Sequence, residues 1–226
     1  MAYLIEQLLN ALVLAGLLFL VSAGLSLVFG ILRVVNFAHG VFYMLGAYFG
    51  FTTVAITGWF WPSLVVVPLV VGTLGALIES STLRFIYRRP QIYQLLLTFG
   101  LALILEESVR VLYGPTAKGV EPPALLQGAI NLGGLLYPRY LLFLVVLSLV
   151  VGAGVWLFLR TTRAGLVIRA VAQNSEMADC LGADVARVRT LVFGAACALA
   201  GLGGVAAAPM TTTTNASTIT AMPMPR

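Results

Sequence analysis

Apolar and polar positions along this chain fall into long alternating blocks. Six apolar runs, separated by short polar stretches, cover residues 8–32, 41–57, 63–83, 91–113, 139–159 and 190–208. Each run is close to the ~20 residues that a helix needs to cross the hydrocarbon core of a bilayer. The pattern therefore predicts an all-α, polytopic helical membrane protein with about six transmembrane helices.

Small residues recur at helical spacing inside three of these runs, which predicts close packing between helices. The three sets are Ser22, Ser26 and Gly30 in the first run, Gly46 and Gly50 in the second, and Ala196, Ala200 and Gly204 in the last.

Composition supports a single membrane domain and excludes an ordinary soluble protein. The chain has 226 residues, of which 60% are hydrophobic and only 9% are charged. Its formal charge of +5 is no sign of nucleic-acid binding, because the basic residues lie at helix ends and in two loops, where membrane topology explains them.

Basic residues set the expected orientation, because Lys and Arg near helix ends resist translocation. Nine of the thirteen Lys and Arg residues fall on one predicted side: Arg33, Arg84, Arg88, Arg89, Arg160, Arg163, Arg169, Arg187 and Arg189. We therefore expect residues 84–90 and 160–189 to be cytoplasmic. The Gly/Pro-rich loop 114–138 and the N-terminus are expected outside.

The polar segment 160–189 has the signals of ordered structure. Thr162 can N-cap one short helix, and Asn174 can N-cap a second of about two turns. Gly182 can supply the left-handed residue that ends the second helix, and Asp184 can cap the helix that follows. A capped helix presented to the cytoplasm indicates a binding partner. The alternative is an ordinary interfacial amphipathic loop.

Three polar residues lie between the first two apolar runs. Arg33, Asn36 and His39 are three residues apart, so they would share one face of a helix. Asn36 and His39 either line a translocation path or gate, or tie a helix break to neighbouring carbonyl groups. The surrounding sequence has no Cys or carboxylate cluster, so a metal site is not expected.

Acidic residues within the predicted spans allow two interpretations. Glu106 and Glu107 lie four and three residues before Arg110, respectively, so either carboxylate could form a local ion pair. Alternatively, these carboxylates could orient a cationic or zwitterionic substrate. Glu79 is expected to pair with one of the arginines that directly follow its span.

No catalytic motif is present, so the chain is not expected to be an enzyme. It contains no GxxxxGK[ST], GxSxG or HExxH sequence. We therefore predict no catalytic residues, no cofactor site and no metal site. Energy must then come from a partner or from an ion gradient. A gradient-driven carrier or channel would need unpaired ionisable residues in the membrane, for which only His39 and one of Glu106 and Glu107 qualify.

Three patches resemble the LivH-type permeases of branched-chain amino-acid ABC transport. They are the segment Gly30–Gly46 around Asn36-Phe37-Ala38-His39-Gly40, the pair Arg89-Pro90 with Leu97–Leu101, and the segment Thr162–Gly182. The resemblance runs from about residue 10 to about residue 208. It implies a permease subunit that uses no cofactor of its own, because a separate ATPase hydrolyses the ATP.

The resemblance also implies partners and a location. The partners are cytoplasmic ABC ATPase subunits, a second homologous permease in a heterodimer, a periplasmic or extracellular substrate-binding protein and the lipid bilayer of the bacterial inner membrane. Branched-chain amino acids are the leading substrates, while other amino acids, short amides and urea stay open. The residues expected to couple to the ATPase are Asn174, Glu176, Met177, Ala178, Asp179, Leu181 and Gly182.

The C-terminal stretch departs from this pattern. Residues 1–208 are expected to form the permease domain, and residues 209–226 a low-complexity, disordered tail. Members of the resembled family continue with further apolar segments, so we expect a C-terminally truncated permease. A truncated chain acting only as a membrane scaffold is the alternative. Asn215-Ala216-Ser217 fits the glycosylation sequon, which is common by chance.

Overall fold

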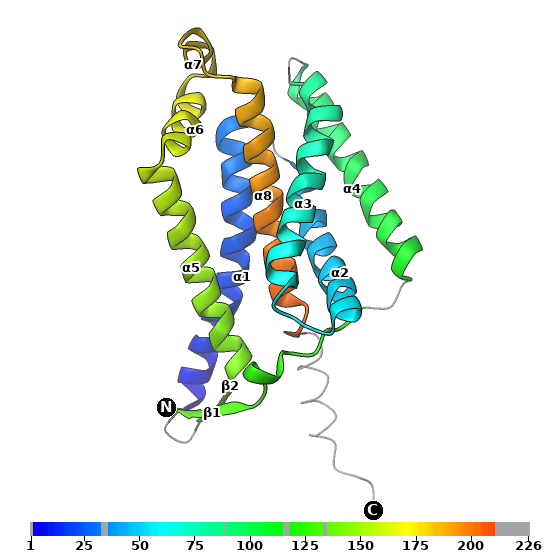
Figure 1. The fold of residues 1–226 in the computed structure, drawn as a ribbon, viewed down its shortest axis with the longest axis vertical. Helices are drawn as coiled ribbons and strands as arrows, with labels where there is room; N and C mark the ends of the chain where they lie inside the picture. Colours follow the sequence, from blue (N-terminus) through cyan, green and yellow to red (C-terminus); the bar gives the residue numbers. More distant parts are fainter. Residues whose placement is uncertain (1, 33–35, 88, 115–117, 133–134, 211–226) are drawn as a thin grey trace, which may run out of the picture.

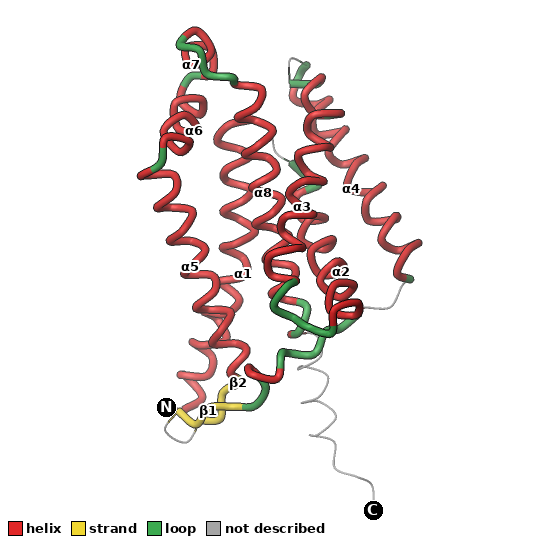
Figure 2. Tube along the Cα trace, in the orientation of Figure 1, coloured by secondary structure: helices red, strands yellow, loops and turns green. Residues whose placement is uncertain are grey.

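The computed structural model describes residues 2–32, 36–87, 89–114, 118–132 and 135–210. Arg33, Arg88 and the Asn215 triplet therefore lie outside the described residues. The described part is all-α apart from one antiparallel hairpin of β1 (Ala129–Leu132) and β2 (Leu135–Pro138) (Figure 2). Its helices are α1 (Ala2–Leu32), α2 (His39–Thr57), α3 (Ser63–Ser81), α4 (Gln91–Tyr113), α5 (Arg139–Thr161), α6 (Arg163–Gln173), α7 (Ser175–Cys180) and α8 (Val185–Ala207).

The long helices run up and down the molecule, and the connecting segments gather at its two ends (Figure 1). Helices α6 and α7 lie at the same end as the turn between α3 and α4. The N-terminus and the β-hairpin lie at the opposite end. This arrangement agrees with the alternating topology expected from the six apolar runs.

Five helices in the described residues, and not six, are long and apolar enough to cross a membrane by length and composition. The exception is α4, which forms at the predicted position but carries Glu106, Glu107 and Arg110. Helix α4 also diverges from the rest of the bundle in Figure 1. Its far end is held by the Tyr113 hydroxyl, which lies 2.7 Å from the Thr52 hydroxyl on α2.

Helix α8 is the centre of the bundle and packs against α1, α2 and α3. Its predicted small-residue stripe of Ala196, Ala200 and Gly204 is buried. A Cβ atom on Gly204 would meet the backbone of Tyr43, and one on Gly46 would meet the backbone of Gly201. Small residues therefore allow α2 and α8 to approach at backbone distance, as predicted.

The small-residue face predicted for α1 is not the packed face. Ser22, Ser26 and Gly30 are exposed in this chain. Helix α1 instead buries a stripe of larger apolar residues that includes Leu20 and Val28. The prediction was wrong because helical spacing identifies a face but does not say which neighbouring element covers it.

The outer loop has more structure than expected. A 3-10 turn at Ala124–Leu126 precedes the hairpin, which leads directly into α5. The hydroxyl of Tyr137 on β2 donates a hydrogen bond to the side-chain oxygen of Asn10 on α1 at 3.0 Å. This bond joins the hairpin to the start of the bundle.

Candidate functional site

The segment between α5 and α8 is a series of capped helices, as the sequence predicts. The Thr162 hydroxyl accepts a hydrogen bond from the Gly165 amide at 2.9 Å and caps α6. The Asn174 side chain accepts from the Met177 amide at 3.0 Å and caps α7. The Asp184 carboxylate accepts from the Arg187 amide at 3.0 Å and caps α8. The three caps satisfy amide groups that would otherwise lack partners at the helix starts.

Gly165 makes the corner between α5 and α6 possible. A Cβ atom at this position would collide with the carbonyl groups of Phe158 and Leu159. Any other residue would force the two helices apart. This glycine lies within the Thr162–Gly182 segment that resembles the permease family, but no local sequence signal indicated its steric role.

Gly182 ends α7, as predicted. Its φ is +86°, in the left-handed region that favours glycine. The Ala183 amide donates to the Ala178 carbonyl at 3.0 Å, and the Gly182 amide donates to the Asp179 carbonyl at 2.9 Å. These two bonds form a Schellman motif, which fixes the direction in which the chain leaves α7 toward α8.

The residues of α7 divide between two faces. The side chains of Met177 and Leu181 are 59% and 82% exposed. Ala178 is only 5% exposed and packs in a small cluster with Val171 of α6 and Val192 of α8. Ala178 therefore faces the bundle, whereas Met177 faces outward, because neighbouring helical residues point about 100° apart.

Glu176 and Asp179 line a polar cleft between α7 and the start of α8. The cleft has a volume of about 360 Å³ and is also lined by Tyr87, Ser175, Val185 and Arg189. We call it the α7–α8 cleft. The sequence analysis included both acids among the expected coupling residues, but did not predict this shared cavity or the place of Arg189 in it.

Glu79 is fully buried at the end of α3 and joins distant segments. Its carboxylate accepts hydrogen bonds from the Tyr87 hydroxyl at 2.8 Å and from the Thr190 hydroxyl at 2.5 Å. Arg84 donates to Thr190 at 3.2 Å and makes no direct ion pair with Glu79. Among the described arginines that follow the span, neither Arg84 nor Arg89 forms the expected ion pair with Glu79. Arg88 lies outside the described residues.

Tyr87 lies just outside the membrane-spanning segments, between α3 and α4. Burial raises the pKa of its phenol far above the usual value, and the hydrogen bond to Glu79 raises this pKa further. The hydroxyl therefore stays protonated at neutral pH and remains a donor to Glu79. This bond joins the α3–α4 turn to Glu79, whose carboxylate also accepts from Thr190 of α8.

Asn36 and His39 form a helix start deep inside the bundle. The Asn36 side-chain oxygen accepts from the Ala38 amide at 3.1 Å. The His39 Nε2 atom lies 3.0 Å from the Val21 carbonyl of α1. Val21 lies about three helical turns before the end of α1. His39 is the first residue of α2, so α2 begins beside the middle of α1, ~16 Å along the helix from its C-terminal end.

Both side chains at this break are buried, and each has one unused polar atom. The Asn36 Nδ2 atom and the His39 Nδ1 atom have no hydrogen-bond partner among the described residues. The geometry shows that His39 ties α1 to α2. It also leaves two polar atoms free to meet water or a polar solute.

Glu106 and Glu107 do not join this site. Arg110 lies 3.5 Å from the Glu106 carboxylate and 3.3 Å from that of Glu107, and all three side chains are at least half exposed. Within the described residues neither acid contacts His39, which lies between α1 and α8. The local ion pair is therefore the observed arrangement.

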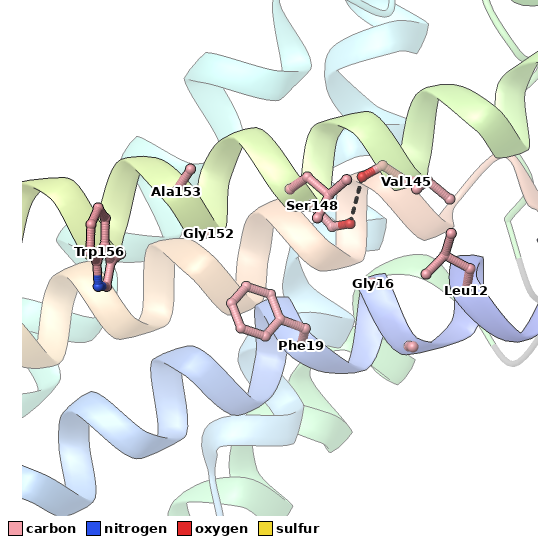
Figure 3. A pocket seen from close by; sticks show the side chains of 10 residues that line it. Leu12, Gly16, Phe19, Val145, Ser148, Gly152, Ala153 and Trp156 are labelled. Carbon is pink, nitrogen blue, oxygen red and sulfur yellow. Dashed lines mark hydrogen bonds between the residues drawn. The ribbon is translucent and has the colours of Figure 1, made fainter.

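An apolar groove of about 480 Å³ between α1 and α5 offers no comparable chemistry (Figure 3). Gly16 and Phe19 line it on α1, and Ser148 and Trp156 line it on α5. The Ser148 hydroxyl is already bonded to the Val145 carbonyl at 2.9 Å. The groove therefore suits contact with apolar chains and not recognition of a charged solute.

Comparison with known proteins identifies one family. Residues 7–224 match the family model described as "Branched-chain amino acid transport system / permease component". The LivH permease protein of Escherichia coli K12, from a high-affinity branched-chain amino acid transport system, is 28% identical over 218 residues, which are 90% of this chain and 70% of the relative.

Two further relatives have similar names. The BraD permease protein of Pseudomonas aeruginosa is 28% identical over 215 residues, covering 89% of this chain and 69% of the relative. The probable LivH permease protein of Methanocaldococcus jannaschii is 29% identical over 205 residues, covering 86% of this chain and 63% of the relative. No solved structure matches the chain significantly.

Proposed function

Because this chain belongs to the family of permease components of branched-chain amino acid transport systems, we propose that it is the membrane-spanning subunit of an ABC importer for these or related amino acids. ATP hydrolysis takes place in separate ATPase subunits, which bind the capped segment at the α6–α7 end. A gradient-driven carrier is less well supported, since both Glu106 and Glu107 are paired with Arg110.

The observation that carries the proposal is the construction of α7. This helix is capped by Asn174, ended by Gly182 and joined to α8 by only a few residues. Met177 and Leu181 form an exposed apolar contact that fits a groove on an ATPase, while Ala178 holds the inner face against the bundle. Because the connection between α7 and α8 is short and ordered, a displacement of α7 by the ATPase would also displace α8.

Helix α8 provides the route into the membrane. It packs against α1, α2 and α3, and its Thr190 hydroxyl is bonded to Glu79 of α3. Movement of α8 would shift these helices as rigid bodies, which is how many transporters alternate access to a central site. Asn36 and His39, with their free polar atoms, are the proposed lining of that path or its gate.

The remaining partners follow from the family. A second homologous permease would complete a heterodimer in the cell membrane, which is the inner membrane in a bacterium with two membranes. A substrate-binding protein outside the cell would dock at the end of the bundle that carries the β-hairpin. ATP is the cofactor of the ATPase partners, and the permease chain itself needs none.

The double variant Met177→Ser, Leu181→Ser tests the proposal. Losing two apolar anchors from a protein interface costs about 2 kcal/mol or more, so affinity for the ATPase should fall at least ~30-fold. ATP-driven uptake of leucine into proteoliposomes should fall with it. The measurements are ATPase co-purification and uptake with the reconstituted transporter.

Leu166→Ser is the matched control. Leu166 is 60% exposed on α6, so the change is chemically similar but lies outside the α7 contact. Its uptake and ATPase binding should stay normal. If the double variant in α7 binds the ATPase and takes up leucine as well as the control does, then α7 is not the coupling surface.

A further inference from the structure

The α7–α8 cleft combines three kinds of lining in one small space. It lies on the bundle side of α7 and has a volume of about 360 Å³, which lies in the usual range for small-molecule sites. A second cleft of about 320 Å³ adjoins it and shares Ser175, Glu176 and Arg189. Glu176 and Arg189 therefore border both spaces.

Arg189 provides a positive group that forms no ion pair with the acids of the described residues. Its guanidinium carbon lies 5.4 Å from the centre of the Tyr87 ring. Its Nε atom is buried and has no hydrogen-bond partner among the described residues. The nearby carboxylate of Glu79 is already bonded to Tyr87 and Thr190. A guanidinium in this state favours a planar anion such as a carboxylate, which it can bind through two parallel hydrogen bonds.

Glu176 and Asp179 provide negative groups on the opposite wall. The two residues are three positions apart on α7, so they lie on the same side of the helix. In the part of the chain that the structure describes, neither carboxylate takes part in an ion pair. Two carboxylates in this position suit an ammonium group, which donates several hydrogen bonds.

The remaining lining is apolar. Leu32 at the end of α1, together with Val185 and Ala186 at the start of α8, also borders the cleft. The cleft therefore presents a guanidinium, two carboxylates and an aliphatic wall. An α-amino acid with an aliphatic side chain carries the three complementary groups on a single carbon atom.

We propose that the α7–α8 cleft binds an aliphatic α-amino acid from the cytoplasmic side. Arg189 holds its carboxylate, Glu176 and Asp179 hold its ammonium group, and Leu32, Val185 and Ala186 contact its side chain. The proposal rests on the proposed function, because it uses the transported class of molecule as the ligand of a second site. An occupant would bridge α7 and α8, so the internal amino acid would act directly on the coupling segment.

L-leucine binding to the purified full-length chain in detergent tests this site. Isothermal titration should detect binding to the wild-type chain. Arg189→Gln should weaken this binding at least tenfold, and so should the double variant Glu176→Gln, Asp179→Asn. N-acetyl-leucine and isoamylamine should bind at least tenfold more weakly than leucine, because each lacks one of the two charges.

Arg187→Gln is the matched control. Arg187 is on the same helix and loses the same charge, but it is exposed and paired with Asp184 at 2.9 Å. This variant should bind leucine like the wild-type chain. Thermal unfolding of each variant shows whether the fold is intact, and the two analogues test the site on the unaltered chain.

Several results would overturn the proposal. Absence of leucine binding to the folded wild-type chain would do so, as would equal binding by wild type and a folded Arg189→Gln variant. A change in ATPase affinity in Arg189→Gln, with leucine binding unaltered, would show that the cleft receives a side chain of the ATPase. ATP-driven uptake reports on the proposed function separately: uptake without cleft binding removes this inference and leaves that function standing.

Discussion

His39 and Glu79 are both buried, and each joins helices that are distant in sequence. His39 contacts the Val21 carbonyl of α1, and Glu79 accepts hydrogen bonds from Tyr87 and from Thr190 of α8. A buried polar group costs free energy unless it is hydrogen-bonded. These side chains therefore favour one arrangement of the helices over alternatives that the apolar surfaces alone would allow.

His39→Ala should destabilise the bundle by about 1–3 kcal/mol. The change removes the bond to Val21 and leaves a cavity between α1 and α8. Thermal unfolding in detergent and abundance in the membrane should fall together with uptake. His39→Gln, which keeps a side-chain hydrogen-bond donor, should lose less stability and less uptake than His39→Ala. Lost uptake in a His39→Ala chain of normal stability would instead show that His39 acts mainly in the translocation path.

Gly182→Val should disrupt the end of α7. A β-branched residue at a φ of +86° costs about 1–3 kcal/mol in strain. ATPase co-purification and uptake should both fall, whereas Gly182→Asn should be milder because Asn tolerates this region better. Gly154→Val on α5, where an added Cβ atom meets nothing within 4 Å, is the control. If the Gly182→Val chain binds the ATPase and drives uptake as well as the Gly154→Val chain does, the left-handed turn at Gly182 is not required for coupling.

At the scale of elements, the start of α8 connects three functional parts. Asp184 caps it, Arg189 faces the α7–α8 cleft, and Thr190 is bonded to Glu79 of α3. Tyr87 also contacts Glu79 and brings in the turn that leads to α4. The first two turns of α8 thus receive the coupling segment on one side and contact α3 and the turn before α4 on the other.

Tyr87→Phe and Thr190→Val should each destabilise the chain by ~1–3 kcal/mol, because each removes one donor from the buried Glu79 carboxylate. The double variant should show a non-additive effect, since both donors serve the same group. Thermal unfolding in detergent measures all three variants. Tyr93→Phe, at an exposed position on α4, should change stability by less than ~0.5 kcal/mol. Equal effects on stability at Tyr87 and Tyr93 would rule out a structural role for the hydrogen bond between Tyr87 and Glu79.

At the scale of the whole molecule, charge and fold indicate the same orientation. The segments around Arg84 and Arg189 meet at one end through the contacts of Thr190. The loop that contains Lys118 lies at the opposite end, with the hairpin. By the positive-inside rule, we expect the end that holds α6 and α7 to be cytoplasmic.

Labelling of intact cells with a membrane-impermeant maleimide tests this orientation. Leu125→Cys, in a Cys180→Ser background, should react from outside because Leu125 is 75% exposed in the outer loop. The native Cys180 is exposed on α7 and should react only after permeabilisation, while the buried Cys197 should stay unreactive. Reaction of Cys180 alone in intact cells would mean an inverted chain, and a cytoplasmic ATPase could not then bind α7.

The sequence by itself determined the membrane class, the positions of the helices, the starts of α6, α7 and α8, and the end of α7. These features depend on neighbouring residues: hydropathy over ~20 positions, and caps that reach three residues along the chain. The tertiary structure alone decided that the packed face of α1 is not the one with Ser22, Ser26 and Gly30, that Ala178 faces inward and that Thr190 reaches Glu79. The α7–α8 cleft also belongs to this second group. Such features depend on which distant helix covers each helix face. A local sequence pattern is compatible with several helix arrangements, and close packing of the whole chain selects one of them.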